Sequence, residues 1–329
     1  MTRTEPEGNP KGRILYAVTG WEPANWLNEF ARAAPDRAVV TAPDGPPDPS
    51  VRYAAVWKHP PGILSSLPNL QVIFSVGAGV DHIFLDPDLP DVPIVRIVAD
   101  DLTARMSEYV VWQVLDHLRH GRLFREQQAK HIWAEPNQPS AADITVGIMG
   151  LGVLGTDAAH KLRHLGFNVT GWSRTPKQVD GVTCHAGNAQ LDAFLGASDI
   201  VVVLLPLTQD TKGLVNRDML MKMKPVTPLG GPVLINAGRG GLQVEADILA
   251  ALDREEGKRG ALMAASLDVF ETEPLPRESP LWRHPRVTIT PHAAASSDPR
   301  HLVPQIVRQI EDFEAGRPLQ NLVDRDTGY

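Results

Sequence analysis

The sequence has little of three features that mark particular classes of protein. Its 329 residues include one cysteine, Cys184, which excludes an internal disulfide framework or a cysteine metal cluster and fits a reducing compartment. Acidic residues outnumber basic ones by 39 to 32, and the net charge of -7 argues against a surface for nucleic acid or anionic membranes. No apolar run approaches the roughly 18 residues of a membrane span, and residues 1–12 are polar and unlike a signal peptide. We therefore expect a cytoplasmic protein.

Short apolar segments alternate with helical patterns, and a hydrophobic content of 43% is enough for two domains. In the first hundred residues the strand-like segments are 14–18, 38–40, 53–57 and 72–76, and residues 25–34 are amphipathic. This alternation predicts a parallel sheet covered by helices. Asp81 and His82 are expected to begin a helix and to have no chemical role. The Pro-, Gly- and Asp-rich stretch 42–50 is predicted to be a loop.

Residues 101–133 nearly lack glycine and proline and carry apolar residues at helical spacing, which predicts one long helix. A second series follows, with helical patterns at 153–165, 244–254 and 298–316. Its predicted strands are 144–149, 169–172, 200–205, 233–236, 264–269 and 287–290. Six strands alternating with helices are typical of a doubly wound dinucleotide-binding domain.

A glycine motif stands where such a domain binds its cofactor. Gly150, Gly152 and Gly155 follow the predicted strand at 144–149 and lead into the predicted helix at 153–165. Glycines there allow a tight turn and close approach of a pyrophosphate, and a helix N-terminus offers free N–H donors. A lone motif of this kind can be a structural loop, but the strand before it and the helix after it favour a dinucleotide site.

The next predicted strand leads into Ser173, Arg174 and Thr175, where an NAD-binding domain would carry an acidic residue for the adenosine ribose. A hydroxyl beside a guanidinium can bind a 2′-phosphate that an acid would repel. NADPH is therefore the predicted cofactor, with NADH as the alternative. The alternative is that Arg174 does not bind the cofactor and is only a solvated cation in a loop.

Three charged or titratable residues follow the last predicted strands. Arg239 lies between two glycines after 233–236, Glu273 follows 264–269, and His292 follows 287–290. Because ligands bind beyond the carboxyl ends of parallel strands, these three are predicted to form a site that reduces the ketone of an anionic substrate. Arg239 would clamp the carboxylate and carbonyl oxygens of a 2-oxo acid, and His292 would protonate the nascent alkoxide. No metal site is predicted.

Each of these assignments has an alternative. Arg239 could form an interdomain salt bridge, and His292 could be one more of 11 histidines. Glu273 is predicted to hold the imidazole and favour its charged form. Glu271 is the rival carboxylate, but it lies two positions nearer the strand and is expected to be directed elsewhere.

The first hundred residues offer a candidate substrate loop. Val76, Gly77 and Ala78 come at the end of the predicted strand at 72–76, and their backbone N–H groups could bind a carboxylate. The same segment could instead be only a tight connection. Trp57, which ends another predicted strand, is expected to line the same cleft.

Six motifs in this order resemble the D-isomer-specific 2-hydroxyacid dehydrogenase family. They are 77–81, 150–155, 204–208, 235–240, 267–274 and 290–292. Segments 91–96, 103–109, 171–174 and 321–329 are similar to the glyoxylate/hydroxypyruvate reductase A branch of that family. The resemblance covers nearly everything after Gly12. Longer stretches at 225–231 and 253–260 depart from the family pattern but lie outside the motifs.

The resemblance implies roles for individual residues. Arg239 would bind substrate, His292 would be the acid/base and Glu273 its partner. Asp268 would lie near the nicotinamide. Further contacts with the cofactor are expected from Val153, Leu154, Leu205, Pro206, Ala237 and Gly238.

The resemblance also implies an α/β architecture of two doubly wound parallel-sheet domains. A Rossmann dinucleotide-binding domain, residues 103–293, would be inserted into a flavodoxin-like substrate domain formed by residues 1–102 and 294–329. The expected protein is a homodimer that reduces glyoxylate to glycolate and hydroxypyruvate to D-glycerate. Shared motifs leave open another small acid, of the D-lactate, formate or phosphite type. A non-catalytic dinucleotide-sensing protein is disfavoured because all three catalytic candidates are present.

Overall fold

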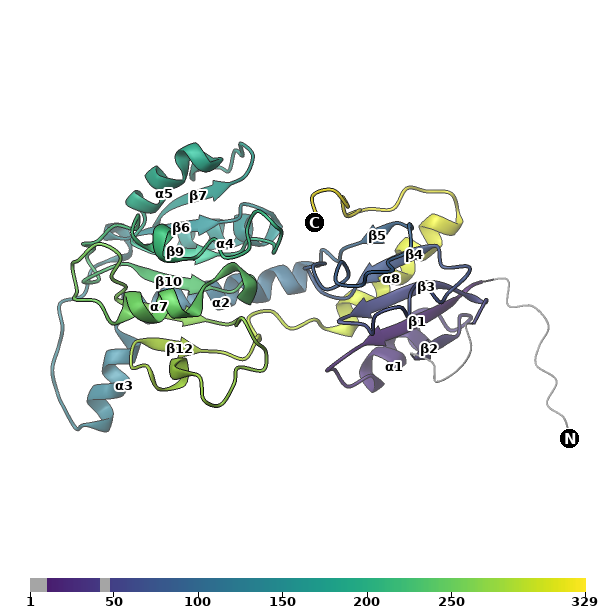
Figure 1. Ribbon diagram of the computed structural model, residues 1–329, viewed down its shortest axis with the longest axis horizontal. Helices are drawn as coiled ribbons and strands as arrows, with labels where there is room; N and C mark the ends of the chain where they lie inside the picture. The colour runs from purple at the N-terminus through teal and green to yellow at the C-terminus, as the bar shows by residue number, and fades with distance from the viewer. Residues whose placement is uncertain (1–10, 42–47) are drawn as a thin grey trace, which may run out of the picture. The chain divides into compact units, whose positions relative to one another are not determined.

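The computed structural model describes residues 11–41 and 48–329, so most of the predicted loop at 42–50 lies outside the described residues. The chain divides into two compact units, Met1–Leu102 with Ser297–Tyr329, and Thr103–Ser296. Each unit contains one parallel sheet (Figure 1), which confirms the predicted α/β class. None of the described helices is both long and apolar enough to cross a membrane.

The first unit has a five-stranded sheet in the order β2-β1-β3-β4-β5. Its strands are β1 (Arg13–Val18), β2 (Val39–Thr41), β3 (Val51–Trp57), β4 (Val72–Ser75) and β5 (Ile94–Val95). All four residues of β4 are buried, as expected for a strand in the interior of a parallel sheet. This strand order is the flavodoxin-like one.

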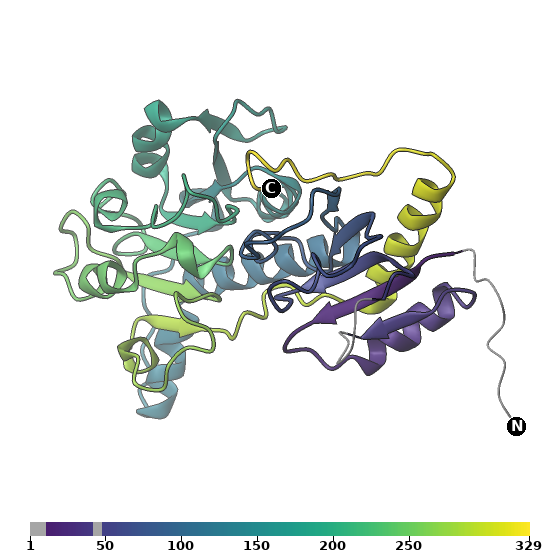
Figure 2. The same cartoon turned by 45° about the vertical axis from the view of Figure 1, so that its right-hand side comes forward.

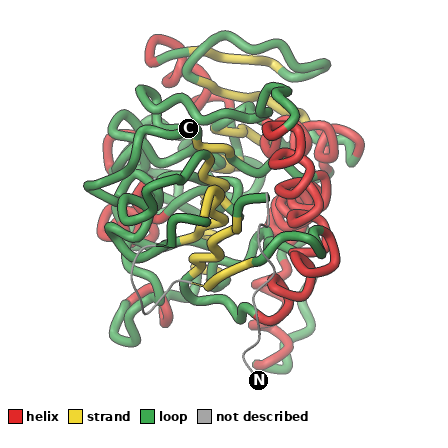
Figure 3. The backbone as a smooth tube through the Cα atoms, turned by 90° about the vertical axis from the view of Figure 1, so that its right-hand side faces the viewer, coloured by secondary structure: helices red, strands yellow, loops and turns green. Residues whose placement is uncertain are grey.

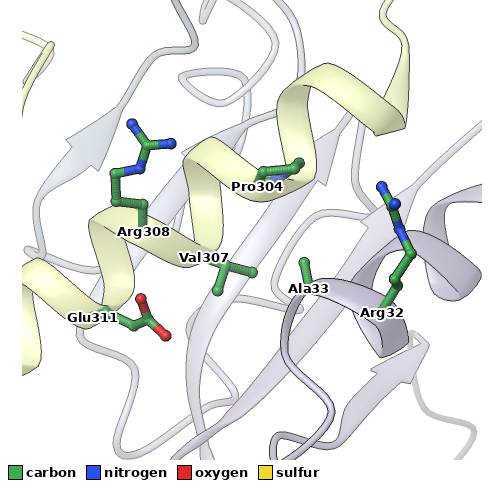
Figure 4. Close-up of a pocket in the computed structure, with 6 residues that line it drawn as sticks. All are labelled: Arg32, Ala33, Pro304, Val307, Arg308 and Glu311. Atoms are coloured by element: carbon green, nitrogen blue, oxygen red, sulfur yellow. The ribbon is translucent and has the colours of Figure 1, made fainter.

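Two helices of this unit, α1 (Ala24–Ala33) and α8 (Pro299–Glu314), pack against each other beside the sheet (Figure 2). An open cavity of about 360 Å³ lies between them (Figure 4). Its lining residues are Arg32, Ala33, Pro304, Val307, Arg308 and Glu311. None of these is a predicted site residue.

The connections after β3 and β4, residues 58–71 and 76–93, contain turns and bends but no helix. Segments of this kind are drawn as green loop in Figure 3. The expectation that Asp81 and His82 begin a helix is therefore wrong, because residues 81–85 form turns. Prolines at 87, 90 and 93 leave too little uninterrupted chain for a helix to propagate.

The second unit has a seven-stranded sheet in the order β12-β11-β10-β9-β6-β7-β8. Its strands are β6 (Thr145–Met149), β7 (Asn168–Ser173), β8 (Thr183–Ala186), β9 (Ile200–Val203), β10 (Val233–Asn236), β11 (Ala264–Leu267) and β12 (Val287–Ile289). The six predicted strands are present, and β8 adds a seventh at the edge. The order reverses between β6 and β9, which is the switch point where doubly wound folds bind ligands.

Helices cover both faces of this sheet. They are α2 (Asp100–Leu118), α3 (Gly121–Ala129), α4 (Val153–His164), α5 (Leu191–Ala197), α6 (Arg217–Leu220) and α7 (Glu245–Leu252), with short 3₁₀ turns η1 (Ala141–Asp143), η2 (Asn188–Gln190), η3 (Gly240–Leu242) and η4 (Pro280–Arg283). Residues of β9 alternate between two cores: Ile200 and Val202 pack with α2 and α4, and Val201 and Val203 with α5 and α7. The sheet is therefore apolar on both faces.

The prediction of one helix over 101–133 is wrong. The chain forms α2 and α3, which are separated at His120, where the backbone is left-handed with φ 56°. A left-handed residue cannot continue a right-handed helix, so the direction of the chain changes there.

Candidate active site

The predicted site residues of the second unit follow six adjacent strands of its sheet (Figure 1). In sheet order, His292 follows β12, Glu273 follows β11, and Arg239 follows β10. The next three strands, β9, β6 and β7, lead into the predicted cofactor segments at 205–206, 150–155 and 173–175. Because parallel strands all end at the same edge, the acid/base candidates and the cofactor candidates share one edge of one sheet.

His292 and Glu273 form a hydrogen-bonded pair. His292 Nδ1 lies 2.8 Å from Glu273 Oε2, and the two side chains are 33% and 21% exposed. The other carboxylate oxygen, Oε1, accepts the Phe270 backbone N–H at 3.2 Å. A carboxylate accepts a hydrogen bond, so Nδ1 keeps its proton and donates it to Glu273, and Nε2 is the ring atom left to exchange a proton with another group.

A left-handed turn carries His292, whose φ is 52°. The His292 backbone N–H donates to the carbonyl of Asp268 at 2.7 Å. The Asp268 carboxylate, 1% exposed, accepts the N–H groups of Ala293 and Ala294 at 2.9 and 3.0 Å. Asp268 thus binds the turn through both its backbone and its side chain.

Glu271 is directed toward α7, away from this pair. Its Oε1 accepts the Glu245 backbone N–H at 2.7 Å, and Glu245 Oε1 accepts the Glu271 N–H at 2.8 Å. Burial raises the pKa of Glu245, although the hydrogen bond from the Glu271 N–H acts in the opposite direction. The rival carboxylate is thus engaged in a local exchange of hydrogen bonds.

Arg239 is half-buried in a loop organised by Asn236, which is fully buried. The Asn236 side chain accepts the Gly238 N–H at 3.0 Å and donates to the Arg239 carbonyl at 3.2 Å. It also donates to Gln243, whose amide in turn donates to the carbonyl of Val269. Neither Asn236 nor Gln243 was predicted as a site residue, although an asparagine at the end of an apolar strand indicates a polar partner.

Gly240 allows the Arg239 loop to pass close to the neighbouring strand end. A Cβ at this position would lie 1.7 Å from the carbonyl oxygen of Phe270, so no side chain fits. Arg239 Nη1 donates to the Gly238 carbonyl at 2.8 Å. A Cβ on Gly238 would lie 3.0 Å from the Leu205 carbonyl oxygen. Close packing therefore explains why a glycine stands on each side of Arg239.

The glycine motif forms a tight turn into α4. Gly150 has φ 108°, and a Cβ on Gly155 would lie 1.9 Å from the Gly150 carbonyl oxygen. The helix has Gly152 as its N-cap, without a side-chain capping hydrogen bond, and a Cβ on Gly152 would meet no atom within 4 Å. No side chain therefore caps the first N–H groups of α4, and the backbone at Gly152 is open to close approach, a geometry that fits a phosphate group.

The predicted cofactor residues differ in what they expose. Arg174 and Thr175 are exposed, whereas Ser173 is 6% exposed and its hydroxyl donates to the Thr175 carbonyl at 2.8 Å. Leu205 and Ala237 are 7% and 4% exposed. These last two residues can therefore offer a ligand little beyond their backbone.

The first unit holds the predicted substrate residues. Val76 is fully buried and its N–H donates to the Val56 carbonyl at 3.1 Å, so neither its side chain nor its N–H is available. A Cβ on Gly77 would lie 2.3 Å from the Trp57 ring, which shows that the indole packs directly on this glycine. Trp57 also stacks on Trp21 at 5.5 Å. Gly77 is also buried, and its N–H donates to Ser75 Oγ at 3.4 Å. Among these residues, the half-buried Ala78 is the one whose backbone N–H stays a candidate for binding an anion.

One group in the described chain has the spacing of metal ligands, namely Asp101, Asp298 and His301. Its residues are half-buried or exposed, and Asp298 is the N-cap of α8. Hydrogen bonding to Arg300 lowers the pKa of Asp298 to about 2. Asp298 is therefore engaged both in capping α8 and in an ion pair with Arg300.

Known proteins are similar to this chain in sequence. The NAD-binding-domain model of the D-isomer-specific 2-hydroxyacid dehydrogenases matches residues 111–294. The chain is 40% identical to glyoxylate/hydroxypyruvate reductase A of Yersinia enterocolitica, with 96% of this chain and 99% of that protein covered.

Solved structures are similar over almost the whole chain. An NADPH-dependent glyoxylate/hydroxypyruvate reductase from Sinorhizobium meliloti, in complex with NADP and sulfate, is 48% identical with a TM-score of 0.91, covering 97% of this chain and 100% of its own. A probable 2-hydroxyacid dehydrogenase from Rhizobium etli, in complex with NADP, HEPES and L(+)-tartaric acid, is 44% identical with a TM-score of 0.89 and the same coverage.

Proposed function

Because the chain belongs to the D-isomer-specific 2-hydroxyacid dehydrogenase family, we propose that it is an NADPH-preferring reductase of small 2-oxo acids. Its substrates are glyoxylate, which gives glycolate, and hydroxypyruvate, which gives D-glycerate. The observation that carries the proposal is the His292–Glu273 hydrogen bond at the sheet edge that also carries Arg239 and the glycine motif. Similarity to glyoxylate/hydroxypyruvate reductase A of Yersinia enterocolitica and to an NADPH-dependent glyoxylate/hydroxypyruvate reductase of Sinorhizobium meliloti supports the choice of substrate and cofactor.

In this proposal, the chain's own residues bind the substrate and move the proton. Arg239 holds the carboxylate and the keto oxygen, which orients the substrate and polarises the ketone. His292 donates the Nε2 proton to the oxygen as it gains charge, while Glu273 holds the ring through Nδ1. Ala78 offers its backbone N–H group to the substrate, and Trp57 packs on the neighbouring Gly77.

The residues that follow β6 and β7 at the carboxyl ends of the strands fit NADPH. The uncapped N-terminus of α4 and the open space at Gly152 suit the pyrophosphate, and Ser173 and Arg174 stand where an acid would repel a 2′-phosphate. When bound, the cofactor supplies the hydride. Residues 103–293 are then the dinucleotide-binding domain, and residues 1–102 with 294–329 are the substrate domain.

A homodimer is also part of the proposal. Four large apolar side chains on α2, on α3 and just after α3 are exposed in the single chain: Trp112, Phe124, Ile132 and Trp133. Exposed large apolar side chains concentrated in one segment are typical of a surface that another chain covers. Sedimentation should therefore give a dimer for the native protein and a shift toward monomer for Trp112→Ser combined with Trp133→Ser.

A cytoplasmic location is proposed from the single cysteine.

The test is the rate of NADPH and NADH oxidation across a panel of 2-oxo acids. We expect glyoxylate and hydroxypyruvate to give the highest kcat/KM, with NADPH preferred, and His292→Asn to lose turnover while still binding NADPH. A preference for pyruvate would favour a D-lactate-type enzyme. Binding of NADPH without turnover on any acid would favour a dinucleotide-sensing protein.

A further inference from the structure

Two hydroxyl groups connect helix α2 to the turn that carries His292. The Tyr109 hydroxyl oxygen lies 2.9 Å from Thr290 Oγ1, which lies 2.6 Å from Asp268 Oδ1. An ionised carboxylate only accepts, so the single Thr290 hydroxyl proton goes to Asp268. Tyr109 must then donate to Thr290. The hydrogen bonds run in one direction, from the helix to the carboxylate.

This chain of hydrogen bonds is shielded from water. Tyr109 is 7% exposed, Asp268 is 1% exposed, and Thr290 is half-buried. Burial raises the pKa of Tyr109, so its hydroxyl keeps the proton that it donates. In such surroundings, the loss of a hydrogen bond to a buried carboxylate costs more free energy than the same loss at the surface.

The Asp268 carboxylate, at which these hydrogen bonds end, holds the turn on both sides of His292. It accepts the Thr290 hydroxyl before the histidine and the N–H groups of Ala293 and Ala294 after it. The Asp268 carbonyl accepts the His292 N–H itself. A non-glycine residue at φ 52° is sterically unfavourable and persists only where its surroundings fix it.

We infer that Tyr109 and Thr290 are positioning residues that fix the Asp268 carboxylate and, through the left-handed turn, direct the His292 imidazole toward Glu273. Neither side chain has to touch the reacting atoms. The inference rests on the proposed function, in which His292 is the acid/base.

The chain offers a matched control for a merely structural effect. His117, also on α2, lies with Nε2 2.9 Å from Ser266 Oγ on β11, two residues before Asp268. This second hydrogen bond joins the same helix to the strand that leads into Asp268, but it does not reach the turn that carries His292. Ser266→Ala therefore removes a comparable contact without freeing His292.

The experiment compares Thr290→Val, Thr290→Ser, Tyr109→Phe and Ser266→Ala with the native enzyme. The measurements are kcat and KM for glyoxylate from pH 5.5 to 9, the dissociation constant for NADPH, and the melting temperature. Thr290→Val should lower kcat about ten- to a hundredfold and change the pH profile, because a misplaced catalytic group loses rate steeply with distance. NADPH binding should change by less than about twofold, because the segments expected to bind the pyrophosphate and the adenosine follow other strands.

The remaining variants separate positioning from stability. Thr290→Ser keeps the hydroxyl and should retain a kcat close to the native value. Tyr109→Phe should lower kcat by a smaller factor and add nothing in the Thr290→Val background, because Tyr109 acts only through Thr290. Ser266→Ala should lower the melting temperature and leave both kcat and the pH profile unchanged.

Native kcat and pH profile in both Thr290→Val and Tyr109→Phe, together with an inactive His292→Asn, would overturn this inference and leave the proposed function standing. An active His292→Asn would contradict the proposed function itself, on which the inference depends. An equal loss of kcat in Ser266→Ala would show a general effect of α2 packing and also overturn the inference. Should Thr290→Val fail to fold, Tyr109→Phe decides, because it removes only one oxygen atom.

Discussion

His117 makes the stability of the second unit depend on pH in a way that can be measured. Burial lowers the pKa of His117 from 6.5 to about 4, and its Nε2 lies 2.9 Å from Ser266 Oγ. The folded protein therefore takes up this proton less readily than the unfolded chain. The corresponding stability is fully present above pH 6.5 and is lost as the pH falls toward 4.

The size of the effect follows from the two pKa values. The interval from 6.5 to about 4 corresponds to at most about 3 kcal/mol of unfolding free energy. Near pH 5 the unfolded chain is almost fully protonated at this site and the folded protein is almost unprotonated. The slope due to His117 is then about 1.2 kcal/mol per pH unit.

Urea unfolding followed by circular dichroism at pH 7, 6, 5 and 4.5 tests this value. His117→Gln keeps a polar side chain but removes the titrating group, so its unfolding free energy should fall less steeply below pH 6.5 than that of the native protein. His164→Gln, at an exposed position on α4, is the matched control and should follow the native slope. Parallel curves for the native protein and His117→Gln would refute the reasoning.

Four further predictions concern the sheet edge. Arg239→Lys should raise KM and lower kcat in steady-state assays, because a point charge replaces a planar fork. Glu273→Gln should leave an active enzyme whose pH optimum for reduction moves downward, because the neighbour of His292 at 2.8 Å loses its charge; an unchanged pH profile would count against the pairing. Arg174→Ala should weaken NADPH binding about ten- to a hundredfold, measured by titration, and leave NADH binding nearly unchanged; equal weakening of both would make Arg174 a loop cation. Gly240→Ala should lower the melting temperature and kcat/KM together, because its Cβ would lie 1.7 Å from the Phe270 carbonyl oxygen.

Apolar segments bounded by glycine or proline allowed most of the sheet to be predicted. The continuous run of β9 and the strand before the glycine motif are two examples. Two edge strands escaped prediction for a physical reason. β8 is half-exposed with the polar sequence Thr-Cys-His-Ala, and β5 has two residues, so neither carries the apolar run that marks a buried strand.

Long-range contacts explain what the sequence did not predict at the candidate site. Tyr109 lies in an apolar helical pattern and is separated from Thr290 by 181 residues, so no local spacing connects them. The roles of Asn236 and Gln243 likewise depend on loops that meet only in the folded sheet. Residues at strand ends could be found because the parallel topology gathers them, whereas the residues that support them have no such rule.

The order of the seven strands also bears on how such a protein can change over evolutionary time. Five strand spacings separate β7, which leads to Ser173 and Arg174, from β12, which leads to His292. At about 4.8 Å per spacing, the two ends lie roughly 24 Å apart. Substitutions at such separations are generally additive in free energy. A lineage can therefore exchange one nicotinamide pool for another by altering the loop after β7, while the acid/base chemistry at the far end of the sheet is inherited unchanged.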